Sequence, residues 1–258
     1  MELSKTSIAI IGTHGSGKTT LIRKAKQTLE KRIHKTVVFT GEVARQCPYE
    51  VGRHSNALAQ TWIIRTQDLL ESFTCSIGLP VVLDRCLIDQ YAYYSYWIGC
   101  KMEVENMMTQ ALSRYREIFM LPPNPQFLED DGVRPVSVNF QERMAERINR
   151  IVDKLKIPII ACEDNEDTTV TQLLQSINKV YECMPEFPSF VDLSLANSGF
   201  GQEIIPKFSD DEAVALIEKF VHVESYRSSL RLPLIHLGSH NPSGLRSWFE
   251  HVGFKFVD

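Results

Sequence analysis

A glycine-rich loop near the start of the sequence has residue types and spacing suited to binding a phosphate group. It fits the pattern G-x-x-x-x-G-K-[ST] from Gly12 to Thr19 and follows the apolar run Ile8–Ile11. Glycines let the backbone turn tightly and direct several N–H groups at one phosphate, and the helix expected to follow adds the positive end of its dipole. The loop therefore predicts a site for a nucleoside triphosphate.

Two side chains at the end of the loop provide a positive charge and a metal ligand. Lys18 can reach the β- and γ-phosphates, and the Thr19 hydroxyl can coordinate Mg²⁺. The residues expected to hold the triphosphate are Gly12, Thr13, His14, Gly15, Ser16, Gly17, Lys18, Thr19 and Thr20.

Polar residues that can act on a phosphoryl acceptor follow the second apolar run, Thr36–Thr40. In a kinase, a carboxylate at the position of Glu42 can accept the proton of a substrate hydroxyl or bind polar groups of the acceptor. Arg45, three residues later, can neutralise an anionic substrate. Spacing alone leaves open the alternative that both are ordinary charged residues of an exposed loop.

An acidic and a basic residue end the third apolar run, which begins at Pro80. At the tip of a buried strand beside the phosphate loop, Asp84 is placed to hold Mg²⁺ through water. Arg85 can bind the acceptor or its phosphate with its forked guanidinium group. The alternative is an ion pair at the strand end that has no part in substrate binding.

Arginines after the fourth apolar run can form a lid over the triphosphate. Arg143, Arg147 and Arg150 have i, i+4, i+7 spacing, which places them on one face of a helix. In many kinases a mobile segment of this kind neutralises the transferred phosphoryl group, and Arg134 and Arg143 are the main candidates for that role. The alternative is a basic face exposed to solvent.

The helical segment 55–75 carries side chains that can recognise a base. Gln60 and Gln67 can hydrogen-bond to the edge of a substrate base, and Trp62 can stack on its face. A tryptophan at a helical position more often belongs to the core. We therefore expect Gln60 and Gln67, rather than Trp62, to contact the substrate.

The elements that must position these residues alternate between strands and helices. Five apolar runs are expected to be strands, at 8–11, 36–40, 80–85, 117–121 and 157–161. Helices are expected at 18–32, 55–75, 90–97, 103–115, 139–156 and 169–182. This alternation favours a parallel sheet with helices on both faces and a site beyond the carboxyl ends of its strands. The predicted fold is an α/β P-loop NTPase three-layer sandwich with a five-stranded parallel sheet.

The sequence changes character near residue 184, where prolines and then glycines punctuate it. We expect residues 1–183 to form the P-loop domain and residues 184–258 to form a small α/β or α+β appendage of unknown role. Within the appendage, helices are expected at 210–223 and 242–251, and strands at 232–237 and 254–257.

The composition limits the classes of function. With 43% hydrophobic and 23% charged residues among 258, the sequence is typical of a soluble globular protein. A net charge of −4 and a pI near 6.0 give no general attraction to nucleic acid or to an anionic membrane, and no apolar run is long enough to span one. The six cysteines lack C-x-x-C spacing, and the segment before the first strand leaves no room for a signal peptide. A cytoplasmic protein with reduced thiols is expected.

Taken together, the motifs resemble P-loop kinases of the NadR ribosylnicotinamide-kinase-like and Ttd14-like ATPase family, relatives of nucleoside and thymidylate kinases. The resemblance covers roughly residues 5–180. The motifs that carry it are Gly12–Thr19, Glu42-x-x-Arg45, Asp84-Arg85 and Asp131-Gly132-x-Arg134. The run from Asp84 to Tyr93 is also similar to the DR-containing segment of thymidylate and deoxynucleoside kinases.

The resemblance implies transfer of a phosphoryl group from ATP, with Mg²⁺, to a small-molecule nucleoside or nucleotide. It implies that Lys18 and the loop amides bind the phosphoryl donor and that Thr19 and Asp84 bind the metal. It puts Glu42 and Arg85 near the acceptor and Arg134 with Arg143 in the lid. The nucleotidyltransferase motif of full NadR proteins is absent from the sequence, and the base of the acceptor is not identified.

Two other functions stay open. One is a nucleotide-dependent ATPase or GTPase switch whose C-terminal part binds a protein. The other is a kinase that acts on a hydroxyl group in a modified nucleic acid. The second of these is not favoured, because it would need the basic face of Arg143, Arg147 and Arg150 to continue to Arg227 and Arg231.

Overall fold

The computed structural model describes residues 5–32, 36–76, 79–128, 137–162, 166–183, 190–193, 221–225, 234–237 and 255–256. The α-helices in these ranges are α1 (Lys18–Arg32), α2 (Ala57–Ser76), α3 (Leu87–Trp97), α4 (Met102–Ala111), α5 (Val138–Leu155) and α6 (Glu166–Cys183). The strands are β1 (Ser7–Ile11), β2 (Thr36–Thr40), β3 (Val81–Asp84), β4 (Tyr115–Met120), β5 (Ile160–Ala161), β6 (Phe190–Leu193), β7 (Val221–Ser225), β8 (Leu234–Leu237) and β9 (Lys255–Phe256).

The larger sheet has the strand order β5-β4-β1-β3-β2-β7. The five strands from β5 to β2 run parallel, as the sequence predicted, and this confirms the α/β P-loop NTPase-like fold. β7 lies antiparallel to β2 at the edge of this sheet. Strands β6, β8 and β9 form a separate parallel sheet. The region after residue 184 therefore contributes one strand to the larger sheet, and its role as an appendage stays a prediction.

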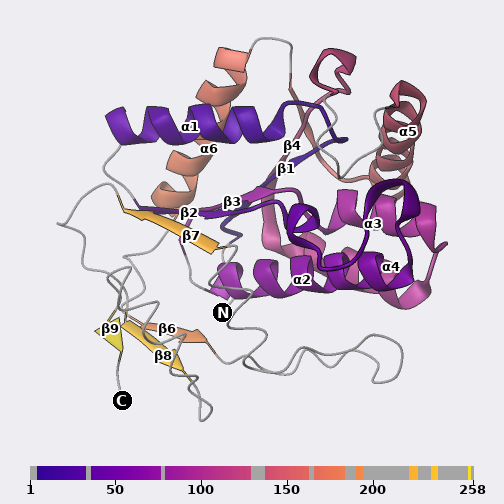
Figure 1. The fold of residues 1–258 in the computed structure, drawn as a ribbon. Coiled ribbons are helices and arrows are strands. Elements are labelled where there is room, and N and C mark those ends of the chain that lie inside the picture. The colour runs from indigo at the N-terminus through magenta and orange to yellow at the C-terminus, as the bar shows by residue number, and fades with distance from the viewer. Residues whose placement is uncertain are drawn as a thin grey trace.

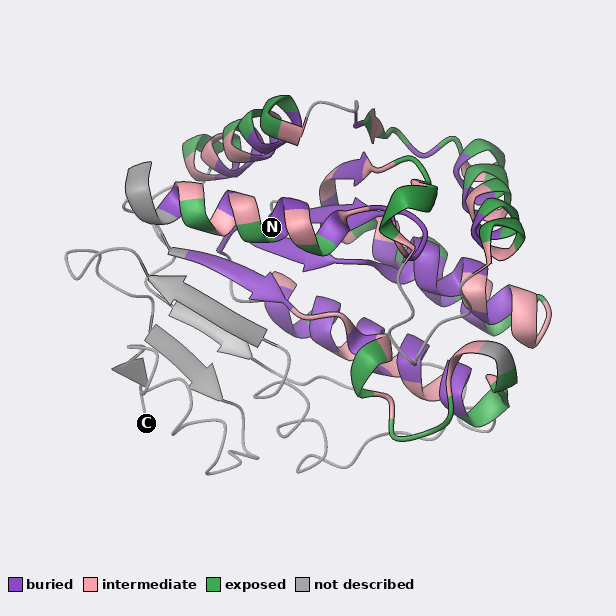
Figure 2. Cartoon of the chain, turned by 45° about the horizontal axis from the view of Figure 1, so that its top comes forward, coloured by how far each residue is buried: buried purple, intermediate pink, exposed green. Residues whose placement is uncertain are grey.

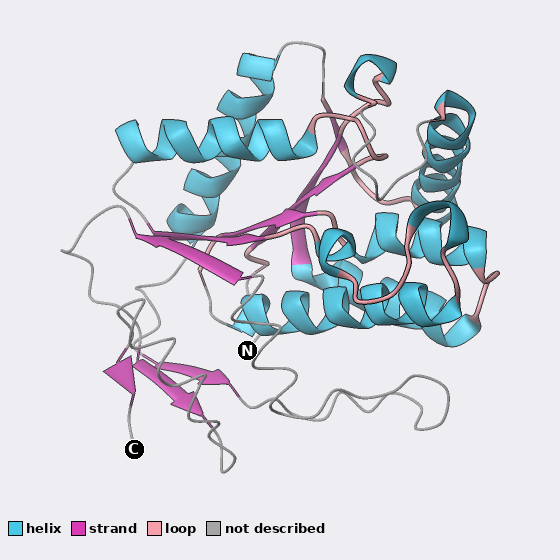
Figure 3. Cartoon of the chain, in the orientation of Figure 1, coloured by secondary structure: helices cyan, strands magenta, loops and turns pink. Residues whose placement is uncertain are grey.

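Helices cover both faces of the larger sheet, so that it forms the middle of three layers (Figure 1, Figure 3). Along β1, Ile8 and Ile10 pack in the core under α1 and α6, whereas Ala9 and Ile11 pack in the core shared with α2, α3, α4 and α5. This is the period-2 alternation of a strand that is buried on both faces. Figure 2 shows the result, with the central strands β1 and β3 wholly buried and the outer helices banded.

Among the segments that differ from the sequence-based expectation, three have a physical explanation in the structure. The helix expected at 103–115 ends at Ala111, and β4 begins at Tyr115, whose buried hydroxyl group hydrogen-bonds to α2. β5 has only two residues, because the nearby Pro158 has no N–H to give to a ladder. Residues 221–223, expected to end a helix, belong to β7, where pairing with β2 prevails over local preference.

The remaining helix predictions beyond residue 184 fall on 210–220 and 242–251, which lie outside the described residues. β8 and β9 correspond to the strands expected at 232–237 and 254–257, and β6 was not expected. None of the helices in the described ranges combines the length and apolar character that crossing a membrane requires.

Candidate active site

The glycine-rich loop connects β1 to α1 through backbone angles that favour glycine. Gly12 and Gly15 have φ angles of 145° and 64°. A Cβ atom at Gly12 would lie 2.9 Å from the Leu121 carbonyl oxygen, and one at Gly15 would lie 2.9 Å from that of Phe127. A larger residue would therefore force the backbone apart at both places. The loop leads directly into the N-terminus of α1 at Lys18, as a phosphate-binding loop should.

A cavity, here called the loop cavity, lies over this loop. Its lining comprises residues 14–20, Glu42 and Arg45 from the segment after β2, and Phe127 and Leu128 from the segment after β4. Seven of the nine residues predicted to hold the triphosphate thus face one space. Gly12 and Thr13 lie beneath them and accept hydrogen bonds through their carbonyl groups.

Lys18 is buried, and its ammonium group binds the loop backbone. Its Nζ donates to the Gly12 carbonyl oxygen at 3.1 Å, to the Ser16 hydroxyl at 3.0 Å and to the Thr13 carbonyl oxygen. A buried ammonium group needs such partners, because removing it from water is costly. The positive charge is therefore fixed beside the loop cavity.

Thr19 and Asp84 form an oxygen pair suited to a magnesium ion. The Thr19 hydroxyl donates to Asp84 Oδ2 at 3.1 Å, and Asp84 Oδ1 is buried with no hydrogen-bond partner among the described residues. Burial raises the pKa of Asp84, while the positive charges of Lys18 and Arg85 oppose the shift. Hydroxyl and carboxylate oxygens are ligands that Mg²⁺ prefers. The residues present therefore fit the predicted metal, which would also occupy the unpaired Oδ1.

Arg85 is the centre of a buried ion-pair network between the loop and α3. Its φ angle of 77° is uncommon for a residue with a side chain. Its Nε donates to Glu42 at 2.8 Å, and its Nη1 donates to the Gly12 carbonyl oxygen at 3.1 Å and to Asp89 at 2.9 Å. The guanidinium group also lies 5.3 Å from the centre of the Tyr93 ring. Most of its hydrogen-bonding capacity is thus used within the protein, as the ion-pair alternative anticipated.

Glu42 lies between two arginines at the edge of the loop cavity. One carboxylate oxygen accepts from Arg85 Nε and the other from Arg45 Nε, each at 2.8 Å. The Glu42 side chain is 6% exposed, whereas that of Arg45 is 45% exposed. Glu42 therefore orients Arg85 and at the same time presents a negative charge to the loop cavity.

Behind Arg85, α2 supplies a buried amide and a buried acid that hold the turn into α3. Gln67 Nε2 donates to the Arg85 carbonyl oxygen and to Glu71, each at 3.1 Å. Glu71 also accepts from the Leu87 N–H at 2.9 Å and from the Tyr115 hydroxyl, and burial raises its pKa to about 7. Gln67 is fully buried and lines neither cavity. This arrangement contradicts the expected contact of Gln67 with a substrate and makes it a support for Arg85.

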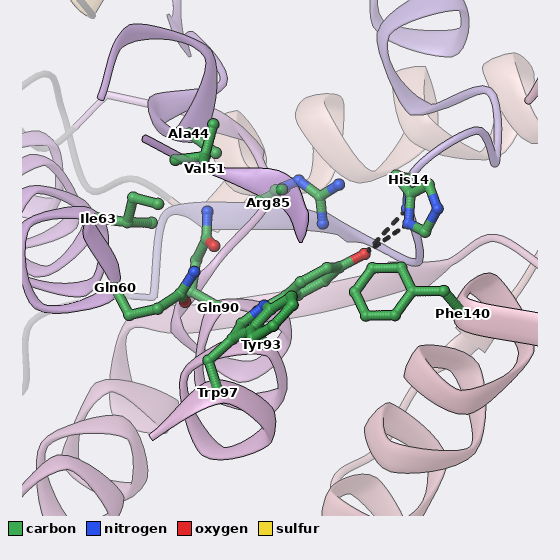
Figure 4. Close-up of a pocket in the computed structure, with 11 residues that line it drawn as sticks. His14, Ala44, Val51, Gln60, Ile63, Arg85, Gln90, Tyr93, Trp97 and Phe140 are labelled. Carbon is green, nitrogen blue, oxygen red and sulfur yellow. Dashed lines mark hydrogen bonds between the residues drawn. The ribbon is translucent and has the colours of Figure 1, made fainter. Parts of the chain in front are cut away.

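A second cavity, here called the aromatic cavity, lies on the other side of the loop (Figure 4). It encloses about 480 Å³, including its open mouth. It is lined by His14, Ala44, Val51, Gly52, Gln60, Ile63, Arg85, Gln90, Tyr93, Trp97 and Phe140. Aromatic rings and amide groups therefore meet in one space, and a planar ligand suits such a space.

His14 belongs to both cavities. Its backbone N–H donates to the Tyr93 hydroxyl at 3.1 Å, and its Nδ1 lies 3.1 Å from the same oxygen (Figure 4). Its ring centre lies 5.3 Å from that of Phe140, and Gln141 Nε2 donates to its carbonyl oxygen at 2.9 Å. Side chains of α3 and α5 thus hold the loop at the point where the two cavities meet.

The family model described as an AAA domain matches residues 7–167 of the sequence. This match spans well over half of the chain. The chain belongs to the AAA domain family. No curated protein matches the sequence. The family and the loop geometry together make this a nucleotide-binding P-loop protein, in agreement with the resemblance drawn from the sequence motifs.

Among solved structures, this AAA domain protein is similar to those of YorR and NadR. YorR from Bacillus subtilis, solved in complex with phosphorylated GDP, is 9% identical with a TM-score of 0.46, covering 70% of this chain and 100% of YorR. NadR, solved with NAD and AMP-PNP, is 16% identical with a TM-score of 0.49, covering 70% of this chain and 51% of NadR. A NadR structure with NR gives 17% identity, a TM-score of 0.49 and coverages of 70% and 52%. The chain thus spans about half the length of NadR.

The arginines on α5 of this AAA domain protein do not line the loop cavity. Arg143 on α5 is exposed and lines neither cavity. Arg147 donates to the Ser95 hydroxyl at 3.0 Å and to the Ser95 carbonyl oxygen at 2.9 Å, and Arg150 pairs with the exposed Glu146. The predicted basic face is thus partly used for packing. Arg134 lies outside the described residues, so the lid stays a prediction.

Most of the residues that sequence reasoning missed line the aromatic cavity, where it had singled out His14, Gln60 and Arg85. Gln60 was expected to contact a substrate and does line this cavity, whereas Trp62 packs against the core. Gln90 and Trp97 were interpreted as part of an aromatic helix. Gln90 also lies in the run that is similar to a segment of thymidylate and deoxynucleoside kinases, but neither residue was assigned to a substrate. A usable signal was present, because the aromatic-rich run of α3 directly follows Asp84-Arg85, at a strand end that leads into the site.

Proposed function

We propose that this protein is an ATP- and Mg²⁺-dependent kinase that transfers the γ-phosphoryl group to a hydroxyl group of a small nucleoside-like or nucleotide-like acceptor. The observation that carries the proposal is that His14 lines both cavities. A triphosphate seated on the loop would end beside a second, differently lined cavity. A transferase needs a separate acceptor site at this place, whereas a simple ATPase needs only room for water.

The donor side of the proposal uses the backbone of the loop and its lysine. The loop amides and the N-terminus of α1 would hold the phosphates, and Lys18 would exchange its carbonyl partners for phosphate oxygens. Thr19 and Asp84 would hold Mg²⁺, which when bound neutralises charge on the β- and γ-phosphates. Each of these groups opposes the negative charge that otherwise repels a nucleophile.

On the acceptor side, the bond between the γ-phosphorus and its bridging oxygen breaks as a bond to the acceptor hydroxyl oxygen forms. The acceptor proton must leave during this exchange. Glu42 is our candidate to receive it, since its carboxylate borders the loop cavity and is held in place by Arg85 and Arg45. Arg85 would keep Glu42 in place and line the acceptor side, and Arg45 would meet anionic oxygens.

The experiment that tests the proposal measures transfer of radioactive γ-phosphate from ATP. The full-length protein is incubated with ATP, Mg²⁺ and a panel of nucleosides, nucleotides and oligonucleotides, and products are separated by chromatography. We expect a labelled small molecule that depends on both the acceptor and Mg²⁺. Slow release of inorganic phosphate with no labelled acceptor would contradict the proposal and favour a nucleotide-dependent switch. Labelling of oligonucleotides alone would favour a kinase of nucleic acid.

A further inference from the structure

Gln90 is a buried amide that lacks a partner for its nitrogen. The residue is 4% exposed, it lines the aromatic cavity, and its Nε2 has no hydrogen-bond partner among the described residues. Buried polar groups are almost always hydrogen-bonded, so an unpaired one in a cavity indicates a missing ligand atom. An amide nitrogen is a donor, and its natural complement is a carbonyl oxygen.

The Nε2 donors of two other glutamines around this site already have partners, although Gln141 Oε1 is buried without one among the described residues. Gln60 also lines the aromatic cavity, but its Nε2 donates to the Ser55 hydroxyl at 2.7 Å. Gln141 Nε2 donates to the His14 carbonyl oxygen at 2.9 Å. The unpaired donor is therefore a particular property of Gln90 and not of every amide that packs beside the loop.

Aromatic rings form the wall opposite the two glutamines. Figure 4 shows Gln60 and Gln90 on one side of the cavity, His14 and Phe140 on the other, and Tyr93 between them. The ring centres of Tyr93 and Phe140 are 6.2 Å apart. Rings in such an arrangement offer faces and edges on which a planar group can stack.

The charges around the aromatic cavity are already balanced. Arg85 is the permanently charged cation of its lining, and it pairs with Glu42 at 2.8 Å and with Asp89 at 2.9 Å. An anionic group in this cavity would lose its hydration, and the one arginine beside it is already paired with two carboxylates. The arrangement therefore favours a ligand part that carries no phosphate.

We propose that the aromatic cavity takes a planar ring bearing a carbonyl group, and that Gln90 selects this ring by donating from Nε2 to the carbonyl oxygen. The inference rests on the proposed function, in which this cavity holds the acceptor, and it narrows the acceptor to a nucleoside-like molecule without a phosphate of its own. Gln90 is then the residue that determines specificity, because a ring without the carbonyl leaves its donor unpaired.

Calorimetric titration of the full-length protein with AMP-PNP and Mg²⁺ present tests this inference without turnover. The probes are two pairs of nucleosides that differ at one ring carbonyl, inosine with purine riboside and uridine with 4-deoxyuridine, and inosine 5′-monophosphate is added. We expect the carbonyl-bearing member of at least one pair to bind roughly tenfold more tightly, and the monophosphate to bind no more tightly than inosine. Equal affinities within both pairs, or no binding of any probe, would overturn the inference.

Variants of Gln90 locate the discrimination. Gln90→Met keeps the length of the side chain but has no donor, and Gln90→Glu replaces the donor with an acceptor. In both variants we expect the ratio of affinities for the carbonyl-bearing and carbonyl-free nucleosides to fall to about one. The matched control is Gln110→Leu, which replaces an exposed glutamine on α4 and should keep the ratio. If the wild-type affinity ratio persists in both Gln90 variants, another residue recognises the carbonyl group and the proposal is overturned.

The transfer assay separates this inference from the proposed function. If the discrimination depends on Gln90 but no probe becomes phosphorylated, the inference stands and the kinase proposal fails. If a probe is phosphorylated and the Gln90 variants bind the two nucleosides of its pair with the wild-type ratio of affinities, the kinase proposal stands and this inference fails.

Discussion

The loop cavity and the aromatic cavity meet at His14 but are built in different ways. The loop cavity takes most of its lining from the consecutive residues 14–20, and its binding groups are largely backbone amides. The aromatic cavity draws side chains from the loop, from the segment after β2 and from α2, α3 and α5. A site made from one short backbone segment can be specified by a short motif. A site made from distant side chains depends on how the whole domain packs.

Removal of the loop lysine should have the largest effect. Lys18→Ala deletes the buried charge that binds the loop and would meet the phosphates, so we expect phosphoryl transfer to be abolished. The measurement is the initial rate of γ-phosphate transfer at saturating ATP. Lys101→Ala, at an exposed lysine before α4, serves as the control. Normal turnover in Lys18→Ala would refute the assignment of the loop.

The next largest effect should come from Glu42, which borders the loop cavity and binds the arginine of the aromatic cavity. Glu42→Gln keeps the shape of the side chain but removes its charge, and if Glu42 accepts the proton, kcat should fall by roughly 10²–10⁴-fold. Steady-state kinetics with varied acceptor concentration provide the test. A change confined to KM would make Glu42 a binding residue instead.

The fold of the P-loop domain was predictable because its signals are local and repeated. Apolar runs such as Val81–Leu83 and amphipathic stripes such as that of α5 reveal strand and helix wherever burial is strong. The prediction was wrong where a partner far away in the sequence decided the structure. Val221–Ser225 is a strand because it pairs with β2, and no window of sequence around it contains that partner.

The two sides of the candidate site were predictable to different degrees for the same reason. Thr19 and Asp84 were paired in advance because the loop motif places Thr19 at the start of α1 and the end of β3 places Asp84 beside it. Gln67 was assigned to a substrate because an amide on this helix can hydrogen-bond to a base, yet it is fully buried and its Nε2 donates to the Arg85 carbonyl oxygen. Gln90 could not be singled out, since an unpaired donor is visible only when all its neighbours are placed.

A pH dependence should reveal the buried support behind the aromatic cavity. Burial raises the pKa of Glu71 from 4.5 to about 7, with Arg114, Asp68 and Tyr115 beside it. The folded protein then binds a proton that the unfolded chain releases, so the contribution of Glu71 to stability is present below pH 4.5 and is lost as the pH rises to about 7. Relative to wild type, Glu71→Gln should gain about 2–3 kcal/mol in free energy of unfolding between pH 5 and pH 8.

Urea unfolding of wild type and Glu71→Gln at the two pH values measures this difference. Glu142→Gln, at an exposed glutamate on α5, should show no such change between pH 5 and pH 8. A constant difference between wild type and Glu71→Gln across this range would show that Glu71 is ionised in the folded protein at both values.

The smallest expected effect tests whether the loop cavity really depends on backbone shape. Gly15 has a φ angle of 64°, and a Cβ atom there would approach the Phe127 carbonyl oxygen to 2.9 Å, whereas Gly99 has a φ angle of 95° and nothing within 4 Å of that position. Both Gly→Ala changes impose strain of about 1–2 kcal/mol in the left-handed region, which thermal unfolding detects. Only Gly15→Ala also displaces the loop, so it alone should weaken binding of AMP-PNP in calorimetric titration. Equal AMP-PNP affinities in the two variants would mean that the loop adapts to a side chain. The loop cavity would then not depend on the shape of its backbone, and the contrast with the aromatic cavity would be wrong.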